Sequence, residues 1–152
     1  MSLRRFDLYD LIAISLGGAF GAALRWSITS LRSPQDGGWF TYGPNTTVTF
    51  DASVTGFAWD TLIVNVLGCL VLGAATALAA RSAGPKRFLL AVGTGFCGSL
   101  TTFSTFAVDV ASGLRDHVAA AAVAYLVLSV AAGGVAFALG RAAAHRLPGA
   151  VS

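Results

Sequence analysis

The stretch from Phe88 to Val108 carries no charged side chain and is long enough to cross a bilayer as a helix. Within it, residues 95–106 read GFCGSLTTFSTF, with two glycines three positions apart followed by clustered Ser and Thr. Gly costs roughly 1 kcal/mol per helix position, and Ser and Thr side chains offer the backbone other hydrogen-bond partners. The sequence therefore predicts a membrane-spanning helix that is broken near its centre. The alternative is a tight helix-packing face made of small and hydroxyl residues.

The composition places the whole chain in a membrane. Of its 152 residues, 55% are hydrophobic and 11% are charged, whereas a soluble domain has roughly 25% charged residues. A soluble protein with so few charges could not cover its surface. We therefore expect residues 1–152 to form one all-α domain that crosses the cell membrane several times.

Four apolar segments predict four transmembrane helices. They cover about residues 8–31, 61–80, 88–112 and 118–140. A long polar loop, residues 32–60, separates the first two. The basic residues flank these segments and form no stripe, so binding to nucleic acid is not expected.

The charges are distributed unevenly between the two sides of such a bundle. Four spans place both termini on one side, and seven of the ten basic residues fall there. The other three are Arg25, Arg32 and Arg115. The positive-inside rule therefore predicts that both termini are cytoplasmic.

Few polar groups lie at membrane depth. The interiors of the last three spans contain no acid, since Asp109 directly follows the uncharged run. Proton-coupled transport normally uses an ionisable relay within the membrane, so the pattern argues against it. No Ser/His/Asp set, metal cluster or phosphate loop is visible, and we expect no enzyme. What remains are hydroxyls, one amide and aromatic ring edges, which suit a small anion.

Several of these side chains also have a purely structural interpretation. Asn65 can line a pore or make an interhelical hydrogen bond. Arg25 can attract anions at a water-filled mouth or extend to the lipid headgroups. Tyr125 and Ser129 share one face of the last span, which suits packing as well as a pathway. Gly17–Gly21 forms a face that lets another helix approach closely.

Residues 95–106 resemble the GFxGxxTTFSTF motif of the CrcB/Fluc fluoride channels. The first two spans are similar to that family as well, through Gly17–Trp26 and Thr61–Gly68. The resemblance covers all four spans in order. It implies an antiparallel dimer of four-span subunits with fluoride pathways at their interface. It also implies passive export of fluoride from the cytoplasm, which lowers fluoride toxicity.

The resemblance further implies which residues form the fluoride pathway. Phe103 and Phe106 would be the pore aromatics, and Asn65 would line the path. The remaining pathway residues implied by the resemblance are Ser104, Thr105, Tyr125 and Ser129.

The resemblance also implies a vestibule residue and a structural cation. Arg25 matches the vestibule arginine of the family. The backbone carbonyls of Gly98 and Thr101, contributed by both subunits, would hold a buried Na+. Oxygen ligands of this kind suit a hard cation.

The sequence departs from the family pattern at three places. Asp60 stands where Gly is usual, Gly133 stands where a second Ser of the last span often lies, and loop 32–60 is longer than usual. The long loop and the charge bias make the two sides unlike each other. The partner in the dimer is therefore either a second copy or an oppositely oriented homologue. The alternatives in function are another small-anion channel, a coupled exporter, or a helix-packing subunit of a larger membrane complex.

Overall fold

The computed structural model describes residues 7–30, 59–81, 86–115 and 119–146. The elements within these ranges are all helical. Four stretches are long and apolar enough to cross a membrane, namely Leu8–Thr29, Trp59–Arg81, Arg87–Arg115 and Ala119–Arg146. The prediction of an all-α membrane protein with four spans is confirmed. Residues 32–58 of the predicted loop lie outside the described residues, and its last two residues belong to the helix that begins at Trp59.

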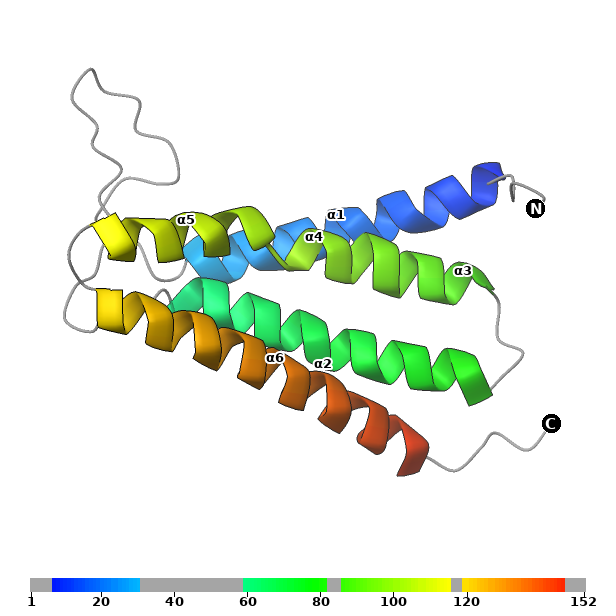
Figure 1. The fold of residues 1–152 in the computed structure, drawn as a ribbon. Coiled ribbons are helices and arrows are strands. Elements are labelled where there is room, and N and C mark those ends of the chain that lie inside the picture. Colours follow the sequence, from blue (N-terminus) through cyan, green and yellow to red (C-terminus); the bar gives the residue numbers. More distant parts are fainter. Residues whose placement is uncertain (1–6, 31–58, 82–85, 116–118, 147–152) are drawn as a thin grey trace, which may run out of the picture.

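Three of the spans are single helices and the third is composite (Figure 1). The single helices are α1 (Leu8–Ser30), α2 (Trp59–Arg81) and α6 (Ala119–Arg146). The third span consists of α3 (Lys86–Leu89), the π-helix η1 (Leu90–Cys97), α4 (Gly98–Leu100) and α5 (Phe103–Arg115). With 28 residues, α6 is the longest. Its length of about 42 Å exceeds the hydrocarbon core of about 30 Å, so the helix crosses the core either tilted or with its ends in the headgroup region.

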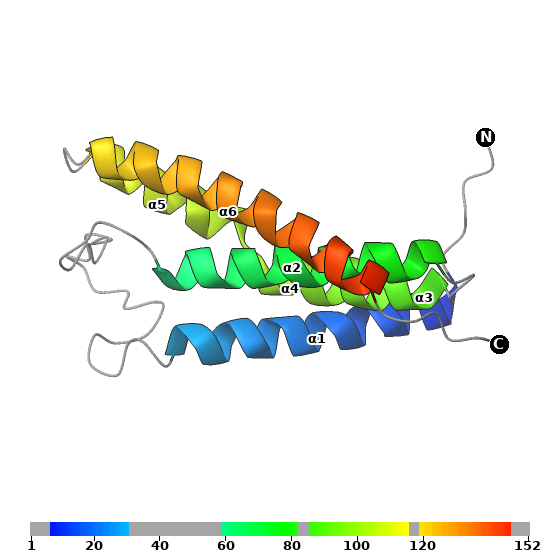
Figure 2. The same cartoon turned by 90° about the horizontal axis from the view of Figure 1, so that it is seen from below.

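The helices run alternately up and down. The most extensive packing is between α2 and α6 and between α1 and η1. Figures 1 and 2 show that the start of α1, the end of α2, the start of α3 and the end of α6 lie at one end of the bundle, which we call the terminal end. The opposite end, where α2 and α6 begin, is called the far end.

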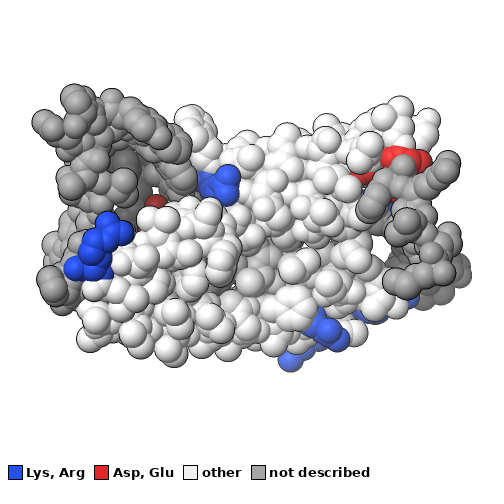
Figure 3. All heavy atoms as spheres, turned by 45° about the horizontal axis from the view of Figure 1, so that its top comes forward, with Lys and Arg blue, Asp and Glu red and all other residues white. Residues whose placement is uncertain are grey.

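Much of the surface of the bundle is apolar. On the face in Figure 3, most of the area of the described helices carries neither Lys, Arg, Asp nor Glu. Large side chains such as Leu16, Phe20, Trp26 and Val130 are exposed in the isolated chain. A surface of this kind faces lipid tails or another membrane subunit, which agrees with a multi-pass membrane protein.

An ion-pair cluster joins two helix starts at the terminal end. The carboxylate of Asp7 accepts a hydrogen bond from the amide of Asp10 at 2.8 Å and so caps α1. Arg87, near the start of the third span, pairs with Asp7 at 2.9 Å and with Asp10 at 3.3 Å. Its guanidinium also lies 5.2 Å from the ring centroid of Tyr9. The cluster adds a polar contact between the starts of α1 and the third span, which already pack along their length.

Glycines bring two pairs of helices into backbone contact. A Cβ atom at Gly17 or Gly21 of α1 would overlap a backbone carbonyl of the third span. The close-approach face predicted from Gly17–Gly21 is therefore confirmed. Between α2 and α6, a Cβ atom at Gly73 or Gly140 would meet a carbonyl of the facing helix in the same way. Small residues at such positions are typical of helix packing in membranes.

We expect Gly21→Ala to lower the stability of the protein. The new methyl group would meet the carbonyl of Phe96, and overpacking of this kind costs about 1–3 kcal/mol. Thermal unfolding of the purified protein in detergent measures the effect. Gly134→Ala on α6 is the matched control, because a Cβ atom there has open space. Equal melting temperatures for the two variants would contradict the contact.

Candidate functional site

The third span is interrupted between α4 and α5. Thr101 has an extended backbone with φ −78° and ψ 157°. Its amide and its hydroxyl both donate to the carbonyl of Cys97, at 3.0 and 2.8 Å. The predicted break near the centre is confirmed, although Gly98 itself remains helical. The interruption therefore follows the glycines and falls on the threonines.

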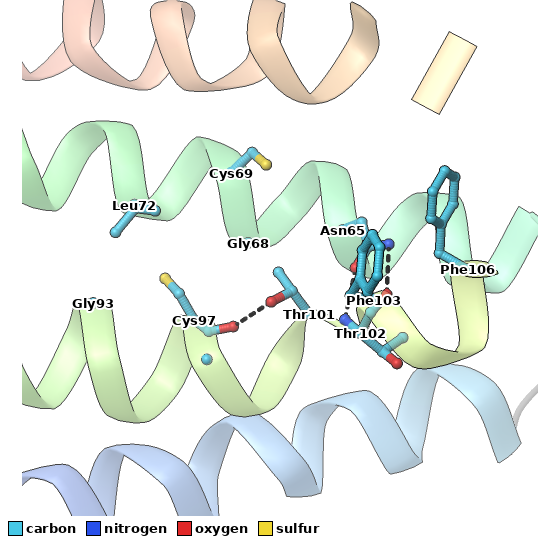
Figure 4. A pocket seen from close by; sticks show the side chains of 11 residues that line it. Asn65, Gly68, Cys69, Leu72, Gly93, Cys97, Thr101, Thr102, Phe103 and Phe106 are labelled. Atoms are coloured by element: carbon cyan, nitrogen blue, oxygen red, sulfur yellow. Dashed lines mark hydrogen bonds between the residues drawn. The ribbon is translucent and has the colours of Figure 1, made fainter. Parts of the chain in front are cut away.

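Asn65 of α2 pairs with the backbone at this interruption (Figure 4). Its side-chain oxygen accepts from the amide of Thr102 at 2.8 Å, and its side-chain nitrogen donates to the carbonyl of Thr102 at 3.1 Å. The Asn65 side chain thus replaces the helical hydrogen bond that the Thr102 amide would donate to Gly98, and it adds a donor to the Thr102 carbonyl, which is also the N-cap carbonyl of α5. Unpaired backbone groups are very costly at membrane depth, so Asn65 stabilises the break. The interhelical hydrogen bond considered for Asn65 is therefore present.

Thr102 also caps the helix that follows. Its hydroxyl accepts from the amide of Thr105 at 3.2 Å and donates to the hydroxyl of Thr105 at 2.9 Å. It lies 3.3 Å from the hydroxyl of Ser104. Thr102 is not among the predicted pathway residues. A Thr directly before an apolar helix is nevertheless an N-cap signal.

These side-chain contacts leave two carbonyls without their usual helical donors. In a continuous helix, the Gly98 carbonyl would accept from the amide of Thr102, and the Thr101 carbonyl from the amide of Thr105. The first amide donates to Asn65, and the second donates to the hydroxyl of Thr102. A Cβ atom at Gly98 would have no neighbour within 4 Å, so this turn borders open space.

A pocket of about 350 Å³ lies between α2 and the third span at this level (Figure 4). Its lining combines small, hydroxyl and aromatic residues. They are Asn65, Gly68, Cys69, Leu72, Gly93, Cys97, Gly98, Thr101, Thr102, Phe103 and Phe106. The centroids of the two Phe rings are 6.1 Å apart, and Phe103 is 80% exposed.

Behind Phe106, a buried polar group lies at the far end. The ring of Phe106 lies 5.6 Å from that of Tyr125, whose hydroxyl donates to Asp109 over 3.5 Å. The expectation of no acid within the last three spans is wrong at Asp109. Because α5 continues to Arg115, this carboxylate is part of the helix and only 9% exposed.

The structure brings part of the predicted site together. Asn65, Phe103, Phe106, Gly98 and Thr101 all line the pocket. Their roles toward an ion stay predictions.

The other predicted residues lie outside this lining. Ser104 and Thr105 contact Thr102, at the start of α5. Tyr125 and Ser129 lie on α6, and the hydroxyl oxygen of Ser129 is buried without a hydrogen-bond partner in the described part of the chain. Arg25 is half-buried on α1. The pathway and vestibule roles of these residues also stay predictions.

Comparison with known proteins identifies the family. A family model described as CrcB-like protein, Camphor Resistance (CrcB), matches residues 12–141. The chain belongs to the CrcB family. The expectation that it is not an enzyme is confirmed, since this is a family of ion channels.

Curated CrcB relatives are similar over most of their length. A protein of Rhodococcus jostii named fluoride-specific ion channel FluC 2 is 39% identical over 81% of this chain and 88% of its own. The FluC proteins of Deinococcus radiodurans and Bordetella petrii are each 34% identical. These matches cover 88% and 91% of this chain, and 94% and 93% of the relatives. The relatives are named for fluoride conduction.

Proposed function

We propose that this protein is a fluoride-selective channel subunit of the cell membrane that lets fluoride leave the cytoplasm passively and so lowers its toxicity. The observation that carries the proposal is the broken third span, whose GFCGSLTTFSTF segment forms one side of a pocket beside Asn65. The names of the relatives point to the same ion.

The chemistry of the pocket suits a small, strongly hydrated anion. Such an ion gives up its water only where other donors replace it, and conduction requires that it is not held too tightly. The hydroxyls of Thr101 and Thr102 already donate to Cys97 and Thr105, so the neutral groups that remain are the second amide hydrogen of Asn65 and the edges of Phe103 and Phe106. Ring edges carry the positive end of the aromatic quadrupole. The pocket thus offers partial charges without a cation that would trap fluoride.

The functional unit is an antiparallel dimer. Phe103 projects from the protein at the pocket with 80% of its surface exposed, next to the open turn at Gly98. A second subunit covering this face would enclose the path. That subunit is either another copy of this chain or an oppositely oriented homologue. Expression of this chain alone separates the two cases, because a functional homodimer would contradict the need for a homologue.

The carbonyls of Gly98 and Thr101 are suited to a structural Na+ at the dimer interface. Both have lost their usual helical donors to side chains, and hard cations prefer oxygen ligands. One chain contributes two such oxygens, so two chains would share the ion. A melting temperature that stays the same when Na+ is replaced by N-methylglucamine would contradict this site.

The termini of the chain are cytoplasmic in this proposal. The terminal end carries Arg81, Arg87, Arg141 and Arg146 among the described residues, whereas the far end carries Arg25 and Arg115. This bias follows the positive-inside rule. Reporter tags at each terminus test it, and an equal population of both orientations would argue for dual topology.

A flux assay tests the function directly. Liposomes containing the purified protein and loaded with fluoride are expected to release it when a K+ ionophore removes the opposing voltage. Release should be insensitive to a pH gradient, and chloride should not be released. Proton-dependent release would favour a coupled exporter, and chloride release a less selective anion channel. No release of either ion would favour a helix-packing subunit.

A further inference from the structure

The polar group behind Phe106 joins three helices. Thr61 of α2, Asp109 of α5 and Tyr125 of α6 are 3%, 9% and 1% exposed. The Tyr125 hydroxyl donates to a carboxylate oxygen of Asp109 over 3.5 Å, and the Thr61 side chain belongs to the same polar group. The three residues lie far apart in sequence and meet only through the packing of the spans.

A carboxylate here needs an explanation in a protein that conducts an anion. In the described part of the chain, the groups that face Asp109 are Thr61 and Asp60 from α2 and Tyr125 from α6, and none is a cation. Ionisable side chains within membrane spans are rare and commonly functional. A negative charge repels fluoride, so a direct ligand role for Asp109 is unfavourable.

The contacts of Asp109 lead instead to the pocket. Tyr125 contacts Asp109 through its hydroxyl and Phe106 through its ring, at 5.6 Å between centroids and 39° between planes. Phe106 in turn lines the pocket and lies 6.1 Å from Phe103. Tyr125 therefore touches Asp109 on one side and a pocket residue on the other.

We propose that Asp109 is a positioning residue, which anchors the Tyr125 hydroxyl so that the Tyr125 ring holds Phe106 in place at the pocket. The inference builds on the proposed fluoride conduction. Asp109 acts as a hydrogen-bond acceptor here, and its charge is not used. The distinction gives the proposal its test, because Asn keeps an acceptor oxygen and Ala does not.

A double-mutant cycle on fluoride flux carries the test. Asp109→Ala and Tyr125→Phe are each expected to reduce flux by about tenfold, and the double variant by no more than either, because both changes break the same contact. Asp109→Asn should retain flux within about twofold, since its amide oxygen replaces the carboxylate as acceptor. Tyr9→Phe, at the exposed terminal end, is the matched control and should conduct normally.

Two outcomes would overturn the proposal. Flux as low in Asp109→Asn as in Asp109→Ala would show that the charge matters, and multiplied losses in the double variant would show that the two residues act separately. If Asp109→Ala does not assemble, fluoride flux is compared between Tyr125→Phe and Tyr125→Phe/Asp109→Asn. The two should conduct equally, because Asp109 has no Tyr125 hydroxyl to anchor in either, and a lower flux in the second variant would overturn the proposal.

The melting temperatures of the wild type, Asp109→Ala, Tyr125→Phe and the double variant separate this inference from the proposed function. A wild-type protein that releases no fluoride contradicts the function alone. Coupling between positions 109 and 125 in the melting temperature supports the contact regardless of transport. Additive shifts would overturn it regardless of transport.

Discussion

Replacing Asn65 with Leu is expected to abolish fluoride flux and to destabilise the protein by about 1–3 kcal/mol, because a buried backbone group left unpaired costs about 1–3 kcal/mol. The group left unpaired is the amide of Thr102, whereas the Thr102 carbonyl loses the Asn65 donor but remains the N-cap carbonyl of α5. Without the Asn65 side chain, the Thr102 amide has no partner at the break, and the pocket loses its shape. Liposome flux and unfolding in detergent measure the two effects.

Two further variants sharpen this experiment. In Asn65→Asp, the ionised carboxylate still accepts from the Thr102 amide but has no hydrogen to donate to the Thr102 carbonyl. The stability of this variant should therefore fall between those of the wild type and the Leu variant. Thr76→Val is the matched control on α2, because the Thr76 hydroxyl donates within its own helix, to the carbonyl of Gly73. A stable, conducting Leu variant would show that the break does not depend on Asn65.

Replacing Phe106 with Ile is expected to reduce fluoride flux by about tenfold or more, which corresponds to a barrier raised by about 1.4 kcal/mol. Ile is apolar and of similar bulk, but it has no ring edge to offer the anion and no ring to pack on Tyr125. Assembly should be unchanged, because Phe106 is only partly buried. Liposome flux and size-exclusion chromatography test the two statements.

Phe20→Ile provides the control for Phe106. Phe20 is 71% exposed on α1 and does not line the pocket, so its replacement should leave flux unchanged. Equal flux in both variants would remove Phe106 from the pathway. Loss of the assembled protein in the Phe106 variant would instead assign this ring a structural role.

The sequence predicts the spans and the existence of the break, because both follow from local composition. Uncharged runs of about 20 residues require membrane helices, and clustered Gly, Ser and Thr weaken a helix at residues 95–106. The position of the break does not follow in this way. Thr102 leaves the helix because Asn65, 37 positions earlier in sequence, provides its hydrogen bonds. A contact of that range is set by helix packing.

The acid within α5 was missed for a related reason. Asp109 follows the uncharged run and is close to Arg115, which is the pattern of a helix end. The helix continues nevertheless, since Tyr125 of α6 and Thr61 of α2 provide polar contacts for the carboxylate. The sequence shows which side chains are polar, whereas the fold determines which of them meet.

The pairing of Asn65 with Thr102 also constrains how the chain is assembled during synthesis. In lipid without α2, the amide of Thr102 would be unpaired in the broken conformation, so the break is stable only beside the second span. The second span leaves the ribosome first and already carries the matching amide. The third span thus becomes stable on entering the bilayer beside an earlier neighbour.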